Sequence, residues 1–368
     1  MVEPGAAETA VCRMLRGDLL PHQLDQSSLQ TAWDYGTFAS ADELLAQLLV
    51  DARPPVPEPI ASQAASRLRD AHARELMRFS MLRELTTAFA AAGLRALLMK
   101  GGGLAYTVYP AAHLRPSDDV DVLIAPDSLA RADAALRALG YGRQIEPDVT
   151  LASTQRHYAL VANGGFERVV DLHWATTNRH SFLHVLAFES AWADSRPVPA
   201  LGGARTLGPV DALLLACTHR VAHHADSPSL LWLWDIHLLV STLTPVEVVV
   251  LVQRAERARV AAVVAHSLRM AEARFATAVD PAISARLRAA TGEPSAAFID
   301  GARRPVDWLV SDLAASGSLT RRLRLLREHL LPPLVYMRQK YAAWPGALLP
   351  LAYVHRALRG APKWFRNG

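Results

Sequence analysis

Two acidic side chains stand one residue apart at the start of an apolar run, Asp119-Val120-Asp121-Val122-Leu-Ile124. Alternate side chains of a strand point to the same face, so Asp119 and Asp121 are expected to share one face while Val120 and Val122 point into a core. Two carboxylates at one spot repel each other unless a cation lies between them, and Mg²⁺ is bound by a few carboxylates together with phosphate oxygens and water. The run therefore predicts a strand whose one face is packed and whose other face carries a divalent metal site.

A lysine followed by three glycines, Lys100, Gly101, Gly102 and Gly103, comes after a short apolar run at residues 94–99. We expect a strand that ends at Lys100, then a glycine turn that lets backbone amides approach a ligand, then a helix through residue 109 whose positive N-terminal end suits phosphate. A Walker A loop has its lysine after the glycines, and the chain has no Gly-x-Gly-x-x-Gly fingerprint, so P-loop and dinucleotide-binding folds are disfavoured. The two motifs together predict an anion site beside a cation site.

Composition divides the chain into three parts. Residues 1–60 read as a helical segment that ends in a proline-rich linker, because proline lacks an amide donor and restricts the residue before it. Residues 61–200 read as a small mixed sheet with helices at 62–92 and 126–139 and a hairpin whose two strands, 157–162 and 166–174, are joined by residues 163–165. Residues 201–368 read as an all-helical domain with a basic C-terminal tail. The predicted fold class is α+β.

The motifs in residues 76–240 resemble a known family. They are Leu98-Met-Lys-Gly-Gly-Gly-Leu-Ala105, Tyr109-Pro110, Arg115, Asp118-Asp-Val-Asp-Val-Leu123 and Val170-Asp-Leu-His-Trp174. They are similar to those of the uncharacterised bacterial nucleotidyltransferase family, which belongs to the DNA polymerase β-like nucleotidyltransferase superfamily. The resemblance implies a mixed sheet with two aspartates on one strand and a third acidic residue on a neighbouring strand.

Asp171 matches that third position, and alternation places it on one strand face with Val169 and His173. Taken alone, Asp171 fits a salt bridge at a strand edge better than a metal site. The resemblance implies that Asp119, Asp121 and Asp171 hold two Mg²⁺ ions and that Lys100, the three glycines and Arg115 bind nucleotide phosphates. The superfamily's usual Gly-Ser turn is Gly101-Gly102 in this chain, and Asp235 matches a recurrent acidic position in the helical domain.

The predicted activity is metal-dependent transfer of a nucleoside monophosphate from a nucleoside triphosphate such as ATP to a hydroxyl of an acceptor, with a small molecule or peptide favoured. The alternative is a catalytically inactive nucleotide-binding or regulatory protein that retains the fold, which the missing serine would suit. A third alternative is a protein that acts through its basic surface. Three acidic positions favour the enzyme, because a binding protein does not need metal ligands. We also expect Asp121→Asn to abolish transfer while metal-free stability holds or rises, since clustered carboxylates repel.

Other features carry weaker predictions. His219, His223 and His224 are assigned structural roles, because adjacent helical residues face different directions and no metal-site motif accompanies them. Trp232 and Trp234 are expected in the helical core, with an aromatic wall for a nucleobase as the alternative. The N-terminus lacks the basic residues of a signal peptide, the longest apolar run is too short to span a bilayer, and two distant cysteines suit a reducing cytoplasm.

Net charge is only +4, but residues 318–368 hold ten lysines and arginines and one acidic residue, Glu328. Solvated helix faces explain such a tail most simply, and an acidic partner, nucleic acid or lipid headgroups are the alternatives. We also expect the C-terminal helices to form one wall of the cleft, because ligand sites favour domain interfaces.

Overall fold

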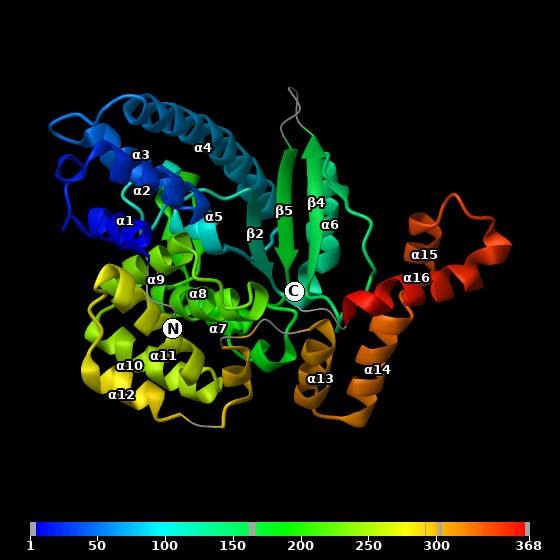
Figure 1. Cartoon of the computed structure of the whole chain (residues 1–368). Coiled ribbons are helices and arrows are strands. Elements are labelled where there is room, and N and C mark those ends of the chain that lie inside the picture. Colours follow the sequence, from blue (N-terminus) through cyan, green and yellow to red (C-terminus); the bar gives the residue numbers. More distant parts are fainter. Residues whose placement is uncertain (1–4, 162–166, 291, 300, 302–303, 365–368) are drawn as a thin grey trace.

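A seven-stranded mixed sheet lies at the centre of the chain, with helices before and after it in sequence (Figure 1). The computed structural model describes residues 5–161, 167–290, 292–299, 301 and 304–364. The strands are β1 (Ala96–Leu98), β2 (Asp119–Ile124), β3 (Gly142–Arg143), β4 (Gln155–Val161), β5 (Glu167–His173), β6 (Arg196–Val198) and β7 (Ala204–Thr206), in the spatial order β3-β4-β5-β2-β1-β7-β6. The predicted α+β class is confirmed, and the expected turn at residues 163–165 lies outside the described residues.

The packed face of β2 is covered by two helices, α4 (Ile60–Ala91) and α6 (Leu129–Ala138). Val120, Val122 and Ile124 alternate along the strand and are buried there against Leu82 and Leu136. This alternation confirms the predicted strand, and it leaves Asp119 and Asp121 on the opposite face. Helix α4 also confirms the helix expected over residues 62–92.

The opposite face of the sheet packs against helices from both ends of the sequence. Leu97 of β1 and Leu123 of β2 belong to one hydrophobic core with residues from the N-terminal helices and from the helices after residue 208. The N-terminal helices are α1 (Ala6–Arg16), α2 (Gln26–Phe38) and α3 (Asp42–Asp51), and the later ones are α8 (Pro209–His223), α9 (Leu230–Thr242), α10 (Pro245–Arg257), α11 (Ala261–Phe275) and α12 (Pro281–Arg288). A buried ion pair between Arg274 and Glu8, 2.8 Å long, fixes α11 to α1.

Two short helices and one further strand pairing complete the sheet region. Helices α5 (Lys100–Leu104) and α7 (Phe188–Ala193) interrupt the strands, and β7 pairs in parallel with β1, so the sheet continues to residue 206. Beyond α7 and the sheet, every described regular element is helical, as predicted for this part of the chain.

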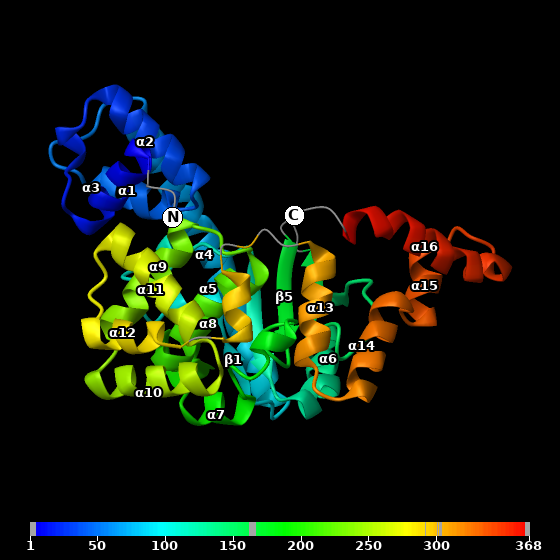
Figure 2. The same ribbon diagram turned by 60° about the horizontal axis from the view of Figure 1, so that its bottom comes forward.

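The last four helices are α13 (Pro305–Ala315), α14 (Leu319–Leu330), α15 (Leu334–Lys340) and α16 (Leu349–Trp364), and in Figure 1 they lie at the right, near β5 and β4, while α9–α12 lie at the left. Trp308 of α13 belongs to the same hydrophobic core as α8–α12. In both views α15 and α16 project away from the rest of the molecule (Figures 1 and 2). Among the described residues, no helix combines the length and apolar character that crossing a membrane requires.

Candidate active and metal-binding site

The acidic strand positions meet because β2 and β5 pair in parallel. In their register Asp121 lies opposite Asp171 and Leu123 lies opposite His173, so all three polar side chains share the face away from α4. One ligand atom each from Asp121, Asp171 and His173 lies within 4.8 Å of the others, and all three residues are buried. Sequence reasoning placed His173 on the face of Asp171 but gave it no role.

This cluster has the chemistry of a metal site. Oδ1 of Asp171 and Nδ1 of His173 are buried and have no hydrogen-bond partner within the described part of the chain, an arrangement that costs free energy unless a ligand pairs with them. Two carboxylates and an imidazole form a donor set that divalent metal ions accept. Asp121, Asp171 and His173 could therefore hold a metal ion.

Lys100 contacts the same cluster. Its Nζ lies 2.7 Å from Oδ1 of Asp121, and Nε2 of His173 lies 2.8 Å from that oxygen. Burial alone would raise the pKa of Asp121, but the Lys100 charge and the His173 hydrogen bond outweigh it and hold the pKa well below its usual range. Asp121 is therefore ionised across the physiological pH range.

Asp119 lies two residues before Asp121 on the same face of β2 and is half-buried. Its Oδ1 lies 3.3 Å from the hydroxyl of Ser117. Burial and then the negative charges of Asp121 and Asp171 raise the pKa of Asp119. The three predicted carboxylates thus interact electrostatically, although the atoms within 4.8 Å of one another come from Asp121, Asp171 and His173.

A second histidine reaches Asp171 from β4, the strand on the other side of β5. His157 lies opposite Asp171 in the antiparallel register, and its Nε2 is 3.3 Å from Oδ2 of Asp171. Its Nδ1 forms a short contact with Glu146. Hydrogen bonds to Asp171 and Glu146 raise the pKa of His157 to about 10, so the imidazolium offsets part of the negative charge of the site. The sequence offered no signal for His157, because its contact with Asp171 depends on which strand pairs with β5.

The triple glycine lies inside the first turn of α5, not before it, and the helix ends at Leu104, earlier than expected. A Cβ on Gly103 would overlap Oγ1 of Thr206 and lie 3.3 Å from the carbonyl oxygen of Leu98, so this glycine is required for packing. At Gly102 a Cβ would meet nothing within 4 Å. Lys100 has a φ of 48°, in the left-handed region that side chains rarely adopt, which indicates that its orientation toward Asp121 is held by the surrounding fold.

Each nitrogen of the Arg115 guanidinium has a hydrogen-bond partner in the surrounding structure. Its Nε and Nη2 donate to the two carboxylate oxygens of Asp235 at 2.8 and 2.7 Å, and Nη1 donates to the carbonyl of Pro116. The hydroxyl of Tyr109 also donates to Asp235, at 2.7 Å. The structure therefore places Arg115 in a buried bidentate pair that joins the loop before β2 to α9.

A cavity of about 570 Å³ opens in front of Lys100, Asp119 and Asp121. Its remaining wall comes from other parts of the chain: the end of α2, the loop that holds Arg115 and Ser117, and helices α8 and α9. The lining includes Phe38 of α2 and Trp232 of α9. Trp234, in contrast, packs edge-on against Phe275 in the helical core, as predicted.

Histidines of α8 and its C-cap complete this wall. His219 and His224 line the cavity, and their Nε2 atoms lie 3.0 Å apart. The ring of His224 lies 4.1 Å from that of Trp232. Burial, with the Lys100 charge second, lowers the pKa of both histidines, so neutral imidazoles face the site. Sequence reasoning assigned these histidines structural roles, because adjacent helical residues face different directions and no metal-site motif accompanies them. Helical spacing does not reveal which site a helix faces.

The comparison with protein families identifies one match. The model of a family described as an uncharacterised nucleotidyltransferase matches residues 29–276, which is well over half of the 368 residues. No curated protein matches the chain. The matched range runs from within α2 to the residue after α11, so it contains the three aspartates, Lys100 and every residue that lines the cavity.

Proposed function

The chain belongs to this uncharacterised nucleotidyltransferase family, and from that membership we propose that it transfers a nucleoside monophosphate from a nucleoside triphosphate such as ATP to a hydroxyl of a small molecule or peptide. The observation that carries the proposal is the parallel register of β2 and β5, which sets Asp121 against Asp171 beside Lys100 at a cavity. A carboxylate cluster next to a cation and an open cavity suits phosphoryl chemistry, where charge must be neutralised on both reactants.

We propose Mg²⁺ as the metal, with two ions held by Asp119, Asp121 and Asp171 and with His173 as an additional ligand. The unpartnered oxygen of Asp171 and nitrogen of His173 support this assignment. When bound, the ions would supply positive charge for the triphosphate and for the attacking oxygen. A cytoplasmic location also belongs to the proposal, on the basis of the two free thiols.

In the proposed reaction the acceptor hydroxyl oxygen forms a bond to the α-phosphorus, the bond from that phosphorus to the bridging oxygen breaks, and pyrophosphate leaves. Asp171 accepts the hydroxyl proton. Lys100 moves from Asp121 to the triphosphate, and the backbone of Gly101 and Gly102 approaches the phosphates, since the space beside Gly102 is open.

The absent serine of the glycine turn has a neighbour that can replace its hydroxyl. A Cβ on Gly101 would lie 3.0 Å from Oγ of Ser117, so this hydroxyl already lies beside the glycines. Nη1 of Arg115 would lie 3.1 Å from the same Cβ on Gly101, and it is also a proposed phosphate contact, whereas Nε and Nη2 donate to Asp235. Trp232 is proposed to stack on the nucleobase, since it lies in the cavity wall beside His224.

The alternative function is nucleotide binding without transfer. The ion pair between Lys100 and Asp121 favours it, because Lys100 occupies the Asp121 oxygen that a catalytic metal ion would need. The two functions differ in one measurable product, pyrophosphate.

Pyrophosphate release is therefore the test. Wild-type protein with a mixture of nucleoside triphosphates, Mg²⁺ or Mn²⁺, and a panel of hydroxyl-bearing small molecules and peptides is expected to release pyrophosphate in a metal-dependent way. Asp121→Asn should lower the rate by about a hundredfold or more, because a metal ligand loses its charge. The matched control is Asp70→Asn, an exposed carboxylate on α4, which should change nothing.

Nucleotide binding measured by calorimetry separates the outcomes. Wild-type protein that binds nucleotide and releases no pyrophosphate with any acceptor would establish the binding protein instead. Full turnover in Asp121→Asn would show that the site is assigned wrongly.

A further inference from the structure

The end of the chain carries an unusual share of exposed apolar side chains. We call residues 319–364, which contain α14, α15 and α16, the C-terminal arm; its last two helices, α15 and α16, project from the rest of the molecule (Figures 1 and 2). Ten of the nineteen exposed large apolar side chains among the described residues lie in this arm, although it is about an eighth of the chain. Exposed apolar side chains gathered in one region mark a surface that binds another protein, a ligand or a membrane.

The apolar side chains form stripes at helical spacing. On α14, Leu319, Leu323 and Leu330 fall on one helix face, and by the same spacing Arg322 and Arg327 lie on either side of that face. On α16, Leu351, Val354 and Leu358 form a second stripe, each more than half exposed. A basic helix with an apolar stripe is typical of elements that lie in the interface of a bilayer.

The charge of the arm is almost entirely positive. Residues 319–364 contain nine lysines and arginines and one acidic residue, Glu328. That carboxylate already accepts hydrogen bonds from the backbone amides of Leu151 and Ala152, at 2.8 and 3.0 Å, and lies 3.2 Å from Arg324. Glu328 thus fixes α14 to the loop before β4 and leaves the remaining cations of the arm without an acidic side chain of their own within its described residues.

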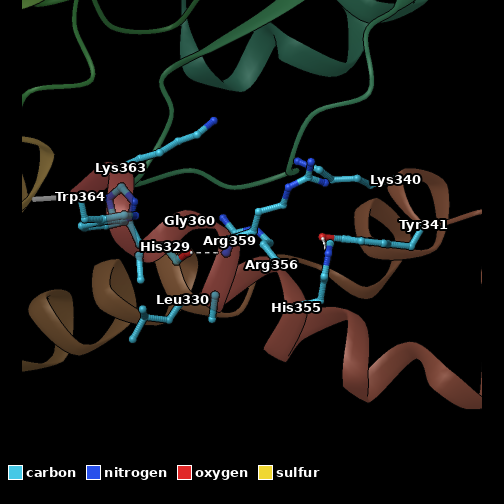
Figure 3. Close-up of a pocket in the computed structure, with 12 residues that line it drawn as sticks. His329, Leu330, Lys340, Tyr341, His355, Arg356, Arg359, Gly360, Lys363 and Trp364 are labelled. Atoms are coloured by element: carbon cyan, nitrogen blue, oxygen red, sulfur yellow. Dashed lines mark hydrogen bonds between the residues drawn. The ribbon is translucent and has the colours of Figure 1, made fainter. Parts of the chain in front are cut away.

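A cavity of about 720 Å³ lies between α14, α15 and α16 (Figure 3). Lys340, Arg356, Arg359 and Lys363 line it together with the apolar groups of Leu330 and Trp364. Figure 3 shows Lys340 on one side of this cavity and Lys363 and Trp364 on the other. The cavity therefore combines several cations with an apolar lining, which matches an anionic headgroup and the start of its acyl chains.

We propose that the C-terminal arm docks on an anionic phospholipid bilayer. The leucine and valine stripes enter the acyl boundary, the arginines and lysines contact headgroup phosphates, and the cavity takes one headgroup. Nucleic acid would match the charge but not the stripes, because aliphatic side chains do not stack on bases. A second copy of the arm would bring like charges together.

Vesicle sedimentation tests the proposal with the full chain and without any enzyme assay. Vesicles made of equal parts phosphatidylcholine and phosphatidylglycerol are expected to sediment the protein, and vesicles of phosphatidylcholine alone are not. Arg322→Gln with Arg327→Gln should lower the partition coefficient by about fivefold for each arginine. Leu323→Ser with Leu358→Ser should lower it by about tenfold for each leucine.

The matched controls are Arg69→Gln and Leu76→Ser, an exposed arginine and an exposed leucine on α4 outside the arm. Both should bind vesicles like the wild type, and circular dichroism of all variants should be unchanged. Raising the salt from about 0.1 to about 1 M should weaken binding, since the Debye length falls from about 10 to about 3 Å.

Three results would overturn the proposal. The first is equal binding to neutral and anionic vesicles, and the second is wild-type binding in the leucine variant. The third is absence of vesicle binding together with binding of single-stranded RNA or of polyglutamate that the leucine variant retains, which would assign the arm to nucleic acid or to an acidic protein.

Discussion

At the scale of single residues, the contacts of Asp121 conflict with a simple account of carboxylate repulsion. Its neighbours Asp119 and Asp171 are acidic, yet Lys100 and His173 contact it directly at 2.7 and 2.8 Å. The depressed pKa of Asp121 shows that these two contacts outweigh both burial and repulsion. The expectation that Asp121→Asn leaves metal-free stability unchanged or higher is therefore replaced by the opposite one.

We predict that Asp121→Asn lowers the metal-free free energy of unfolding by about 2 kcal/mol, because it leaves the Lys100 ammonium without its counterion in a largely buried place. A carboxyl whose pKa is lowered by folding stabilises the native state above its ordinary pKa and loses that contribution as pH falls. The wild type should therefore lose its advantage below about pH 4. Urea unfolding at neutral and acidic pH measures both, and Asp121→Asn with Lys100→Met should restore most of the loss. An unchanged or higher stability of the single variant would show that repulsion among the clustered carboxylates dominates.

The glycines of α5 provide a second prediction, as a matched pair. Gly103→Ala should destabilise by about 1 to 3 kcal/mol, because its methyl group would overlap Thr206 and press on Leu98. Gly102→Ala should leave stability equal or higher, since alanine favours a helix and no atom lies within 4 Å, while the Michaelis constant for the nucleotide rises if phosphates approach there. Thermal unfolding of the two variants tests the predicted stabilities, and nucleotide titration tests the predicted role of Gly102. Equal nucleotide affinity in Gly102→Ala would remove this glycine from the phosphate site.

At the scale of elements, the junction of α3 with α4 contains a buried acidic pair. Glu43 is 1% exposed and lies 2.7 Å from Arg67 and 3.0 Å from Arg74, with Asp42 beside it. Burial and the neighbouring Asp42 raise the pKa of Glu43 to about 7, despite the arginines. The folded protein therefore holds a proton that the unfolded chain releases between about pH 4.5 and pH 7.

The buried Glu43 predicts that the stability of the protein depends on pH, with a definite sign. The raised pKa means that the contribution of Glu43 to stability is present below about pH 4.5 and is lost as pH rises through about 7. Glu43→Gln, which mimics the protonated form, should be more stable than the wild type at pH 8 by about 3 kcal/mol and equal to it at pH 4. Differential scanning calorimetry at the two values tests this. A variant that is less stable at pH 8 would show that the arginine contacts dominate.

At the scale of the whole molecule, three separate parts of the sequence build one cavity. The sheet supplies the acidic residues, the end of α2 supplies Phe38, and α8 and α9 supply the opposite wall with His219 and Trp232. The predicted wall from the C-terminal helices is thus provided by α8 and α9, whereas the basic arm lines a different cavity. The proposed membrane contact and the proposed catalysis lie in different regions of the fold.

The pair of Arg115 and Asp235 joins two of those parts, and we predict that breaking it is costly. Asp235→Asn should lower the free energy of unfolding by about 3 to 5 kcal/mol, because both side chains are at most 7% exposed and Arg115 would keep an uncompensated buried charge. Arg115→Met with Asp235→Leu should cost much less, since both charges are removed together. Urea unfolding of the single and double variants forms the test. Equal losses in the two would mean that Asp235 contributes through Tyr109 or packing.

The sequence by itself determined the local features. Alternation along a strand needs only neighbouring residues, so the shared face of Asp119 and Asp121 and the packed face of Val120 and Val122 followed from the order of residues. Proline and glycine positions are local signals for the same reason, because they act on the backbone where they stand. The family resemblance added Asp171 as the third acidic position.

The tertiary structure alone decided which of these residues meet. The register that sets Asp121 opposite Asp171, and that brings in His173 and His157, depends on pairing between strands far apart in the sequence. The partner of Arg115 likewise lies 120 residues away, on α9. Such contacts arise when the whole chain buries its apolar faces together, and no local period in the sequence encodes them.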